Sequence, residues 1–281
     1  MRGHQGRLRH AEARHPAGRQ GQSEPGRDGA CEIDAAFGAA GDGNGISGGL
    51  PHGRAGQSSE IAPERNKIVK DRRQFILENT GIVRPPHVPE IALHVATEAF
   101  DLWYKTEEEL EAAGLPPPYW AFAWAGGQGL ARYVLDNPDC VAGLSVLDFA
   151  SGSGLVAIAA AMAGAKTVTA CEIDAWACEA MAINAALNGV TFDIQQGDIA
   201  GTDGGWDVIL AGDVFYEKAM ADRLAPWFAT LAARGARVLI GDPKRAYCPV
   251  DRLTLLATST VPVSRELEDQ EIKNTNVWRF S

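Results

Sequence analysis

Strand-like and helix-like patterns alternate along the second half of the chain. Short runs rich in apolar and β-branched residues fall at 145–149, 167–171, 191–195, 208–210, 237–240, 261–264 and 276–280. Apolar residues recur with the helical period in the segments between most of them, at 154–163, 175–187, 219–232 and 252–258. Because parallel strands need helical crossovers, this alternation predicts an α/β, Rossmann-like fold built from βαβ units, with helices on both faces of the sheet.

Helical patterns also precede this part of the chain. Phe75 begins a short amphipathic segment, and Pro89 and Glu90 open a helix that is predicted to reach about Tyr104. A further helix follows the glycine pair at 126–127. We therefore expect a folded part over 71–281, made of an N-terminal helical part (71–140) and a core (141–281).

Residues 1–70 have the composition of a disordered tail. Residues 1–60 hold 14 of the 31 glycines. Their strongly apolar side chains are only Met1, Leu8, Ile33, Phe37, Ile46 and Leu50. Such a segment cannot bury enough apolar surface to offset its chain entropy. It lacks the apolar stretch of a secretory signal, and its acidic residues count against a mitochondrial transit peptide. An over-long gene start explains it equally well, so we assign it no role.

Charge and cysteine content narrow the class of protein. The formal net charge of −10 argues against a broad surface that binds nucleic acid. No apolar stretch is long enough to span a membrane. Five cysteines without a CxxC pair argue against a disulfide scaffold and a structural zinc site, and favour the cytoplasm. His87 and His94 have no cysteine or acid at ligand spacing, so we predict no metal site.

A glycine-containing turn carries the strongest local signal. The string VLDFASGSGLVA at 146–157 runs from a strand through Gly152 and Gly154 into a helix. Glycine permits a tight turn and close ligand approach, and the helix N-terminus offers free amides. The string also satisfies the G-x-G-x-x-A fingerprint of dinucleotide sites, a match that is weak when taken alone.

Acidic residues beside this turn indicate the ligand. Asp148 ends the first strand just before the glycines, where it would repel a pyrophosphate and attract a cation. S-adenosylmethionine carries both a sulfonium and an ammonium group, so the charge favours it over NAD. The next strand ends in Glu172 and Asp174, either of which can accept the ribose hydroxyls. Glu172 is the first choice, because Asp174 is well placed to cap the following helix.

Two further strand ends contribute polar groups. Asp198 follows the third strand and can accept the adenine amino group, although a Gly-Asp turn alone would also explain it. The fourth strand leads into Asp213 and Tyr216, at the edge where open α/β sheets bind ligands. Asp213 is either a helix-capping acid or a catalytic group, and the pairing with Tyr216 favours catalysis.

Longer strings give a resemblance to a known family. They are VPEI at 88–91, PPYWAFAWAGGQ at 117–128, DVFY at 213–216 and GDPKRAY at 241–247. From about Phe75 to Phe280 the chain resembles class I S-adenosylmethionine-dependent methyltransferases with an Asp-x-x-Tyr motif. Within that class it resembles the electron transfer flavoprotein β-subunit lysine methyltransferase family. The resemblance implies a seven-stranded sheet in the order 3-2-1-4-5-7-6 with one antiparallel strand, and that flavoprotein subunit as the protein partner.

The resemblance also assigns roles to single residues. S-adenosylmethionine would be bound by Trp124, Asp148, Gly152, Gly154, Glu172 and Asp198. Asp213 and Tyr216 would form the catalytic, acceptor side of the site. The chain departs from many relatives of this fold at Ala150, where they carry the first glycine of the loop.

The chemistry places one demand on this site. A lysine with a pKa near 10.4 must lose a proton before transfer, at a cost of about 4.6 kcal/mol at pH 7. We expect Asp213 to orient the amine and Tyr216 to shape its slot. Three alternatives stay open: another methyl acceptor such as ribosomal protein L11 or a small amine, a catalytically silent S-adenosylmethionine-binding module, and an NAD-dependent oxidoreductase.

Overall fold

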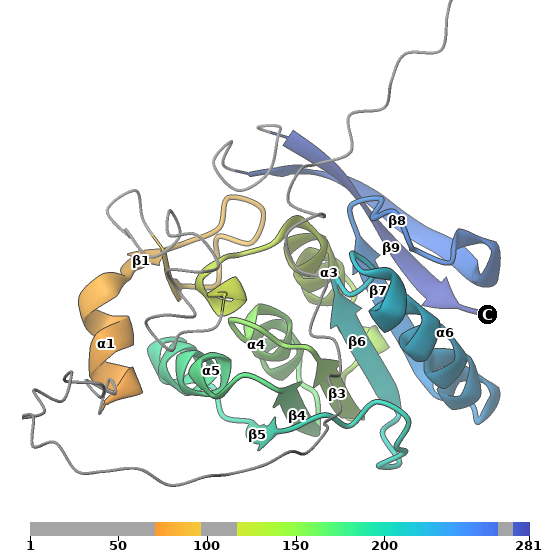
Figure 1. Cartoon of the computed structure of the whole chain (residues 1–281), viewed down its shortest axis with the longest axis horizontal. Coiled ribbons are helices and arrows are strands. Elements are labelled where there is room, and N and C mark those ends of the chain that lie inside the picture. Colours follow the sequence, from red (N-terminus) through yellow and green to blue (C-terminus); the bar gives the residue numbers. More distant parts are fainter. Residues whose placement is uncertain (1–70, 97–116, 264–271) are drawn as a thin grey trace, which may run out of the picture.

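The computed structural model describes residues 71–96, 117–263 and 272–281 (Figure 1). Its core is a seven-stranded sheet. The strands are β3 (Ser145–Phe149), β4 (Thr167–Glu172), β5 (Asp193–Gln196), β6 (Val208–Gly212), β7 (Arg237–Asp242), β8 (Leu253–Pro262) and β9 (Ile272–Phe280). The predicted tail, residues 1–70, lies outside the described residues, so its assignment stays a prediction.

The strand order is β5-β4-β3-β6-β7-β9-β8. Strands β3 to β7 pair in parallel, and β9 pairs antiparallel with both β7 and β8. Numbered from β3 as strand 1, this order is 3-2-1-4-5-7-6, which confirms the predicted topology. The parallel pairing brings the carboxyl ends of β3, β4, β6 and β7 to one edge of the sheet.

Helices cover both faces of this sheet (Figure 1). Alternate residues of each strand point to opposite faces. One set packs against α3 (Ala125–Asp136), α4 (Leu155–Met162) and α5 (Ala175–Leu187). The other set packs against α6 (Lys218–Ala233), where Phe228 is fully buried. The central strands β3, β6 and β7 are therefore buried on both faces, as their nearly continuous apolar sequences indicate.

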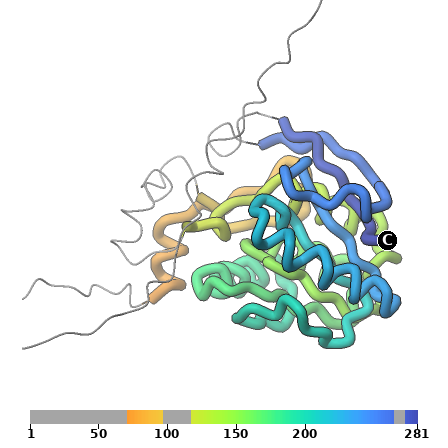
Figure 2. Tube along the Cα trace, turned by 45° about the vertical axis from the view of Figure 1, so that its right-hand side comes forward, coloured from red at the N-terminus to blue at the C-terminus, as the bar shows by residue number. Residues whose placement is uncertain are grey.

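Among its described residues, the N-terminal part contains strands as well as helices. The described elements are α1 (Arg72–Asn79), β1 (Gly81–Val83), β2 (Leu93–Val95), η2 (Tyr119–Ala121), α3 and η3 (Pro138–Cys140). Phe75 of α1 packs edge to face on Trp176 of α5, with ring centroids 5.1 Å apart. In both views α1 lies on the α5 side of the molecule, away from α6 (Figures 1 and 2).

The helix that is predicted to begin at Pro89 and Glu90 and to reach about Tyr104 is wrong at its start. Residues 93–95 form β2, which pairs antiparallel with β1. Side chains at the C-terminal end of α5 hold the adjacent backbone: the C-cap residue Asn188 bonds both the N–H and the carbonyl of Ala92, and Asn184 accepts the N–H of His94. These partners lie 90 and 96 residues away in the sequence, and they satisfy backbone polar groups of the extended segment. Residues 97–104 lie outside the described range.

The helix predicted over 252–258 is also wrong. After η4 (Val250–Arg252), the segment from Leu253 is strand β8, paired with β9 along its whole length. The register shifts between Leu255 and Ala257, so Leu256 is the extra residue of a β-bulge. This extra residue interrupts the alternation of side chains between the two faces of the strand. The apolar residues then recur at a spacing that resembles that of a helix.

Within the described ranges, no helix has the length and apolar character needed to cross a membrane. The part of the chain that the structure describes also contains no group of three or more His, Cys, Asp or Glu side chains that could hold a metal ion.

Candidate active site

The loop after β3 has an unusual backbone. Ala150, Gly152 and Gly154 all have positive φ, at 53°, 54° and 83°. A Cβ on Gly152 would meet no atom within 4 Å, whereas a Cβ on Gly154 would lie 3.2 Å from Cγ of Met181. Gly152 therefore borders open space where a ligand can approach. Gly154 serves the turn and the packing of α5, and it occupies the N-cap position of α4.

Asp148 lies beneath this loop. Its Oδ2 accepts the hydroxyl of Ser151 and, at 2.9 Å, the N–H of Ala157. The residue is only 1% exposed. Burial raises the pKa of its carboxyl group from 3.8 to about 7, and the charge of Glu172 adds to the shift. Asp148 thus stabilises the loop through these hydrogen bonds. A cationic ligand bound beside the loop would favour the ionised form of its carboxyl group.

Glu172 joins the tip of β4 to the same loop. Its carboxylate accepts the N–H of Gly152 at 3.1 Å and the N–H of Ile173 at 2.8 Å. Burial is the main cause that raises its pKa. Asp174 instead accepts the N–H of Trp176 at 2.8 Å as the N-cap of α5. Of the two acids considered for the ribose, Glu172 is therefore the one beside the loop.

Asp198 has partners away from the loop. It accepts the N–H of Ala200 at 3.0 Å and forms a 2.7 Å ion pair with Arg223 of α6. Arg223 is the main cause that lowers the pKa of this half-exposed acid. The hydrogen bond to Ala200 shows that Asp198 stabilises the turn after β5. Its contact with adenine stays a prediction.

Asp213, at the end of β6, is held from two sides. Its Oδ2 accepts the N–H of Gly127, in the first turn of α3, at 2.9 Å. Its Oδ1 accepts Nε and Nη2 of Arg245 at 3.2 and 2.8 Å. Asp213 also has a positive φ of 56°, and its N–H donates to the carbonyl of Gly241. It therefore caps α3, which is distant in sequence, whereas Glu217 occupies the N-cap of the following helix.

Three glycines bring α3 against the strand ends. A Cβ on Gly126 would lie 2.4 Å from Oδ2 of Asp213, and a Cβ on Gly241 would lie 2.1 Å from the carbonyl oxygen of Gly126. A Cβ on Gly212 would lie 2.9 Å from Cα of Gly127. Real Cβ atoms do not approach this closely, so only glycine at 126 and 241 allows the backbone contacts that position Asp213.

Aromatic side chains surround the acceptor side. The ring of Tyr119 lies 6.2 Å from that of Tyr216 and 6.1 Å from that of Trp124, centroid to centroid. Trp124 donates its indole N–H to the carbonyl of Tyr119 at 2.8 Å. The guanidinium carbon of Arg245 lies 6.0 Å from the Trp124 ring centroid. Burial is the main cause that raises the pKa of Tyr216, although its side chain is partly exposed. Trp124, Asp213 and Tyr216 are thus brought together.

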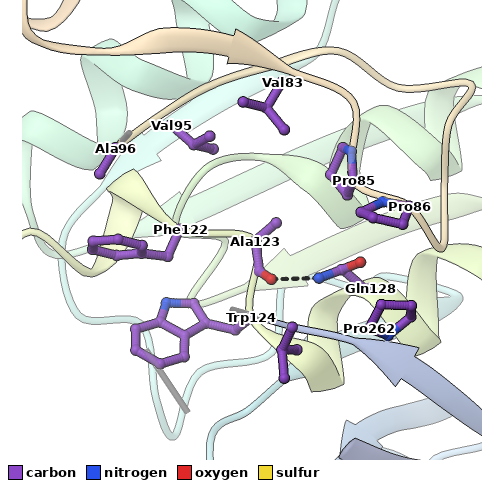
Figure 3. A pocket seen from close by; sticks show the side chains of 11 residues that line it. Val83, Pro85, Pro86, Val95, Ala96, Phe122, Ala123, Trp124, Gln128 and Pro262 are labelled. Atoms are coloured by element: carbon purple, nitrogen blue, oxygen red, sulfur yellow. Dashed lines mark hydrogen bonds between the residues drawn. The ribbon is translucent and has the colours of Figure 1, made fainter. Parts of the chain in front are cut away.

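Trp124 also lines a cavity of about 350 Å³ (Figure 3). It is lined mainly by apolar residues from the end of β1 and the loop after it, the end of β2, the segment between η2 and α3, and the end of β8. Gln128 lines the same cavity and donates its amide to the carbonyl of Ala123 at 2.6 Å. The cavity therefore adjoins the aromatic residues without containing the two catalytic candidates.

Sequence reasoning missed the residues that position Asp213. Arg245 follows the fifth strand with Asp242 and Tyr247, where the sequence indicates only that it could face the substrate, and the glycine pair at 126–127 is predicted only to begin a helix. Both occur in the strings that carry the family resemblance, at 117–128 and 241–247. The sequence indicates that Arg245 follows a strand and that the glycine pair begins a helix. Their contacts with Asp213 depend on the fold and could not be predicted from the sequence.

Comparisons with known proteins find methyltransferases. The family model of ribosomal protein L11 methyltransferase (PrmA) matches residues 133–217. The electron transfer flavoprotein β-subunit lysine methyltransferase of Xenopus laevis is 41% identical over 227 residues, covering 78% of this chain and 91% of the relative. The enzyme of the same name from Danio rerio is 40% identical, covering 75% and 84%. A solved ribosomal protein L11 methylase from Lactobacillus delbrueckii subsp. bulgaricus is 23% identical, with a TM-score of 0.41 over 57% of this chain and 81% of that one.

A parallel sheet with this order and a reversed β9 is the fold of class I methyltransferases, whose methyl donor is S-adenosylmethionine. The extent of the similarity also settles a narrower assignment. The chain belongs to the electron transfer flavoprotein β-subunit lysine methyltransferase family.

Proposed function

We propose that this enzyme transfers a methyl group from S-adenosylmethionine to a lysine side chain of the electron transfer flavoprotein β subunit. The observation that carries the proposal is the similarity to the Xenopus laevis enzyme of that name, which extends over 78% of the chain. It includes the N-terminal part that supplies Trp124 and Tyr119, beyond the core that the L11 methyltransferase model matches.

The residues beside the glycine loop fit the methyl donor. Gly152 borders open space, and the carboxylates of Asp148 and Glu172 flank it at the ends of adjacent strands. Asp148 would favour the cationic ligand through charge, Glu172 would accept the ribose hydroxyls and Asp198 the adenine. Trp124 would cover the opening to the acceptor. When bound, S-adenosylmethionine supplies an electrophilic methyl group on a sulfonium.

The acceptor side is formed by Asp213 and Tyr216. One bond from Gly127 and two from Arg245 fix the Asp213 carboxylate, and Oδ2 keeps a lone pair that can accept an N–H of the substrate amine. The rings of Tyr119, Trp124 and Tyr216 provide apolar walls for the lysine methylenes. Desolvation by these walls favours the neutral amine, which is the nucleophile. Positioning is then the main contribution of the protein.

The net charge of −10 supports a lysine-bearing protein as partner rather than a nucleic acid. Free cysteines in the described part, such as the buried Cys171, support a reducing compartment, and we propose the cytoplasm.

Radiolabelled methyl transfer from S-adenosylmethionine tests the proposal. The full chain is incubated with purified flavoprotein β subunit, with ribosomal protein L11 and with whole-cell lysate. We expect one labelled protein, the β subunit, and label that mass spectrometry assigns to lysine. Label on L11 or on another lysate protein would contradict the proposed substrate, while methyl transfer to a protein would still hold. No transfer to any protein would contradict lysine methylation.

The role of Asp213 is tested with Asp213→Ala. We expect this variant to lose most turnover while it retains its affinity for S-adenosylmethionine, measured by calorimetry. Near-normal turnover would contradict the assigned role.

A further inference from the structure

Asp213 and Arg245 form a partly buried ion pair at the acceptor side. The two bonds from Arg245 both reach Oδ1, and the exposed fractions of the two side chains are 11% for Asp213 and 24% for Arg245. The backbone of Arg245 is also fixed, because its N–H donates to Oδ1 of Asp242 at 2.8 Å. The guanidinium thus lies between the carboxylate of Asp213 and the ring of Trp124.

This ion pair matters because the carboxylate of Asp213 has two opposing effects on the acceptor lysine. A carboxylate is well suited to orient a lysine side chain, but a bare carboxylate within 4–6 Å stabilises the charged ammonium and raises its pKa by about 1–3 units. The ammonium has no lone pair with which to accept a methyl group. A negative charge at Asp213 without compensation would therefore bind the acceptor in the wrong protonation state.

Other charged and titratable groups face the same place. Negative charge comes from Asp242 at the end of β7, from Glu172 at the end of β4 and from Glu217 after β6. Phenolic groups come from η2 and from the segment after β6, and Arg245 comes from the segment after β7. The described first turn of α3 offers the backbone N–H of Gly127 and no charged side chain. Without the positive charge of Arg245, the acceptor lysine would be surrounded mainly by acidic side chains.

We propose that Arg245 is a positioning residue that neutralises Asp213, so that the acceptor lysine occupies the site as the uncharged amine. The inference rests on the proposed function. The ammonium proton passes to solvent as the side chain enters, and the amine then donates one N–H to the remaining lone pair of Asp213 Oδ2. Asp213 keeps its orienting role, while Arg245 removes the electrostatic penalty on deprotonation.

The pH dependence of turnover tests this role. We compare Arg245→Gln, which removes the charge, with Arg245→Lys, which keeps a charge and loses the two-pronged geometry. Arg234→Gln is the matched control, because Arg234 pairs with Asp203 outside the site. At pH 7 we expect Arg245→Gln to lose about tenfold or more in kcat/KM, the factor for one pKa unit of the lysine. The loss should shrink as the pH rises towards 10, and Arg245→Lys should keep most of the unaltered pH profile.

Proton release provides a second readout that needs no turnover. Calorimetry follows binding of the flavoprotein β subunit to the enzyme saturated with S-adenosylhomocysteine, in buffers of different ionisation enthalpy. We expect about one proton released per acceptor with the unaltered enzyme and clearly fewer with Arg245→Gln.

Two outcomes would overturn the proposal. A loss in Arg245→Gln that is equal at all pH values, with proton release unchanged, would assign Arg245 a structural role. A lower KM for the acceptor at pH 7 with no loss of kcat would mean that Arg245 competes with the substrate for Asp213. Failure of the unaltered enzyme to label the β subunit is a separate result. It would refute the proposed substrate, and the same variants would then be compared on the acceptor labelled in lysate.

Discussion

Asp148 caps helix α4 from the neighbouring strand: its Oδ2 accepts the N–H of Ala157, the third residue of the helix, at 2.9 Å. The N-cap residue itself is Gly154, which has no side chain to serve this purpose. A free amide in the first helical turn is normally satisfied by a local Ser, Thr, Asp or Asn. Here the cap comes from the end of β3, so the same carboxylate fixes the loop and contributes charge to the ligand site.

This arrangement predicts a trade between stability and ligand affinity. The pKa of Asp148 is about 7 in the folded protein against 3.8 ordinarily, so the folded state holds an extra proton between about pH 4 and 7. Stability conferred by the protonated form is therefore present at low pH and is lost as the pH rises through 7, at a cost of up to about 4 kcal/mol. We expect Asp148→Asn to be more stable than the unaltered protein at pH 8 and to bind S-adenosylmethionine more weakly.

Urea denaturation at pH 5 and pH 8, with calorimetry for the ligand, checks this prediction. Asp242, whose pKa burial raises to about 6, remains in the variant, so the pH dependence should be reduced rather than abolished. Asp193→Asn, at an exposed position of β5, is the control for removing a carboxylate from the surface. An unaltered slope between pH 5 and 8 in Asp148→Asn would contradict the prediction.

Ala150 has a backbone conformation that favours glycine. Its φ of 53° is in the left-handed region, which costs a non-glycine residue about 1–2 kcal/mol. Glycine removes this cost and adds about 0.5–1 kcal/mol of unfolded-state entropy. We expect Ala150→Gly to stabilise the protein by about 0.5–1 kcal/mol in urea denaturation. Ala161→Gly, inside α4, should instead destabilise by about 1 kcal/mol. A destabilised Ala150→Gly variant would show that the left-handed position carries no net strain.

The glycine pair at the beginning of α3 predicts opposite effects at adjacent positions. A Cβ at 126 would overlap Asp213 and the carbonyl of Gly241, whereas a Cβ at 127 would meet its nearest atom, Cδ2 of Leu155, at 4.0 Å. We expect Gly126→Ala to lose several kcal/mol of unfolding free energy and most turnover, because α3 must shift. Gly127→Ala should keep or slightly raise stability. Thermal denaturation of both variants checks this, and equal stabilities would contradict it.

Asn188 is expected to control local opening of the β1–β2 hairpin. Its side chain bonds both backbone polar groups of Ala92, at 2.9 and 2.6 Å. Asn188→Ala leaves these groups without their partner, at a cost of about 1–3 kcal/mol. Hydrogen exchange should then quicken at residues 92–95 and stay unchanged in the central strands β3 and β6. Asn188→Asp, which keeps the acceptor and loses the donor, should have an intermediate effect. Uniform acceleration throughout the core would mean that Asn188 supports global stability instead.

Local pattern was sufficient for the central elements and for the acids at the strand ends. Helix α5 begins and ends where its apolar period does, and the strand–loop–helix around Gly152 follows from the string itself. The failures have a common cause, since they occur where a distant segment decides the structure. β8 is a strand because β9 pairs with all of it, and β2 is one because Asn184 and Asn188 hold its backbone.

In the candidate site, too, the sequence predicts what depends on local pattern and not what depends on distant segments. Glu172 and Asp213 could be proposed because each follows a buried strand, and parallel strands bring their ends together. The pairing of Asp213 with Arg245 could not be proposed, since it spans 32 residues and depends on where the chain turns after β7. The cap on α3 depends on an even longer separation, 86 residues from Gly127 to Asp213.

The glycine contacts at α3 also limit how this enzyme can be recombined with its relatives. The similarity to L11 methyltransferases covers residues 133–217, which include Gly212 and Asp213 but neither Gly126 nor Gly241. A chimaera that exchanges only this core would place a foreign strand end against the beginning of α3, where there is no room for a Cβ. The transferable unit for changing substrate specificity is therefore larger than the shared core: it extends at least from Gly126 to Arg245.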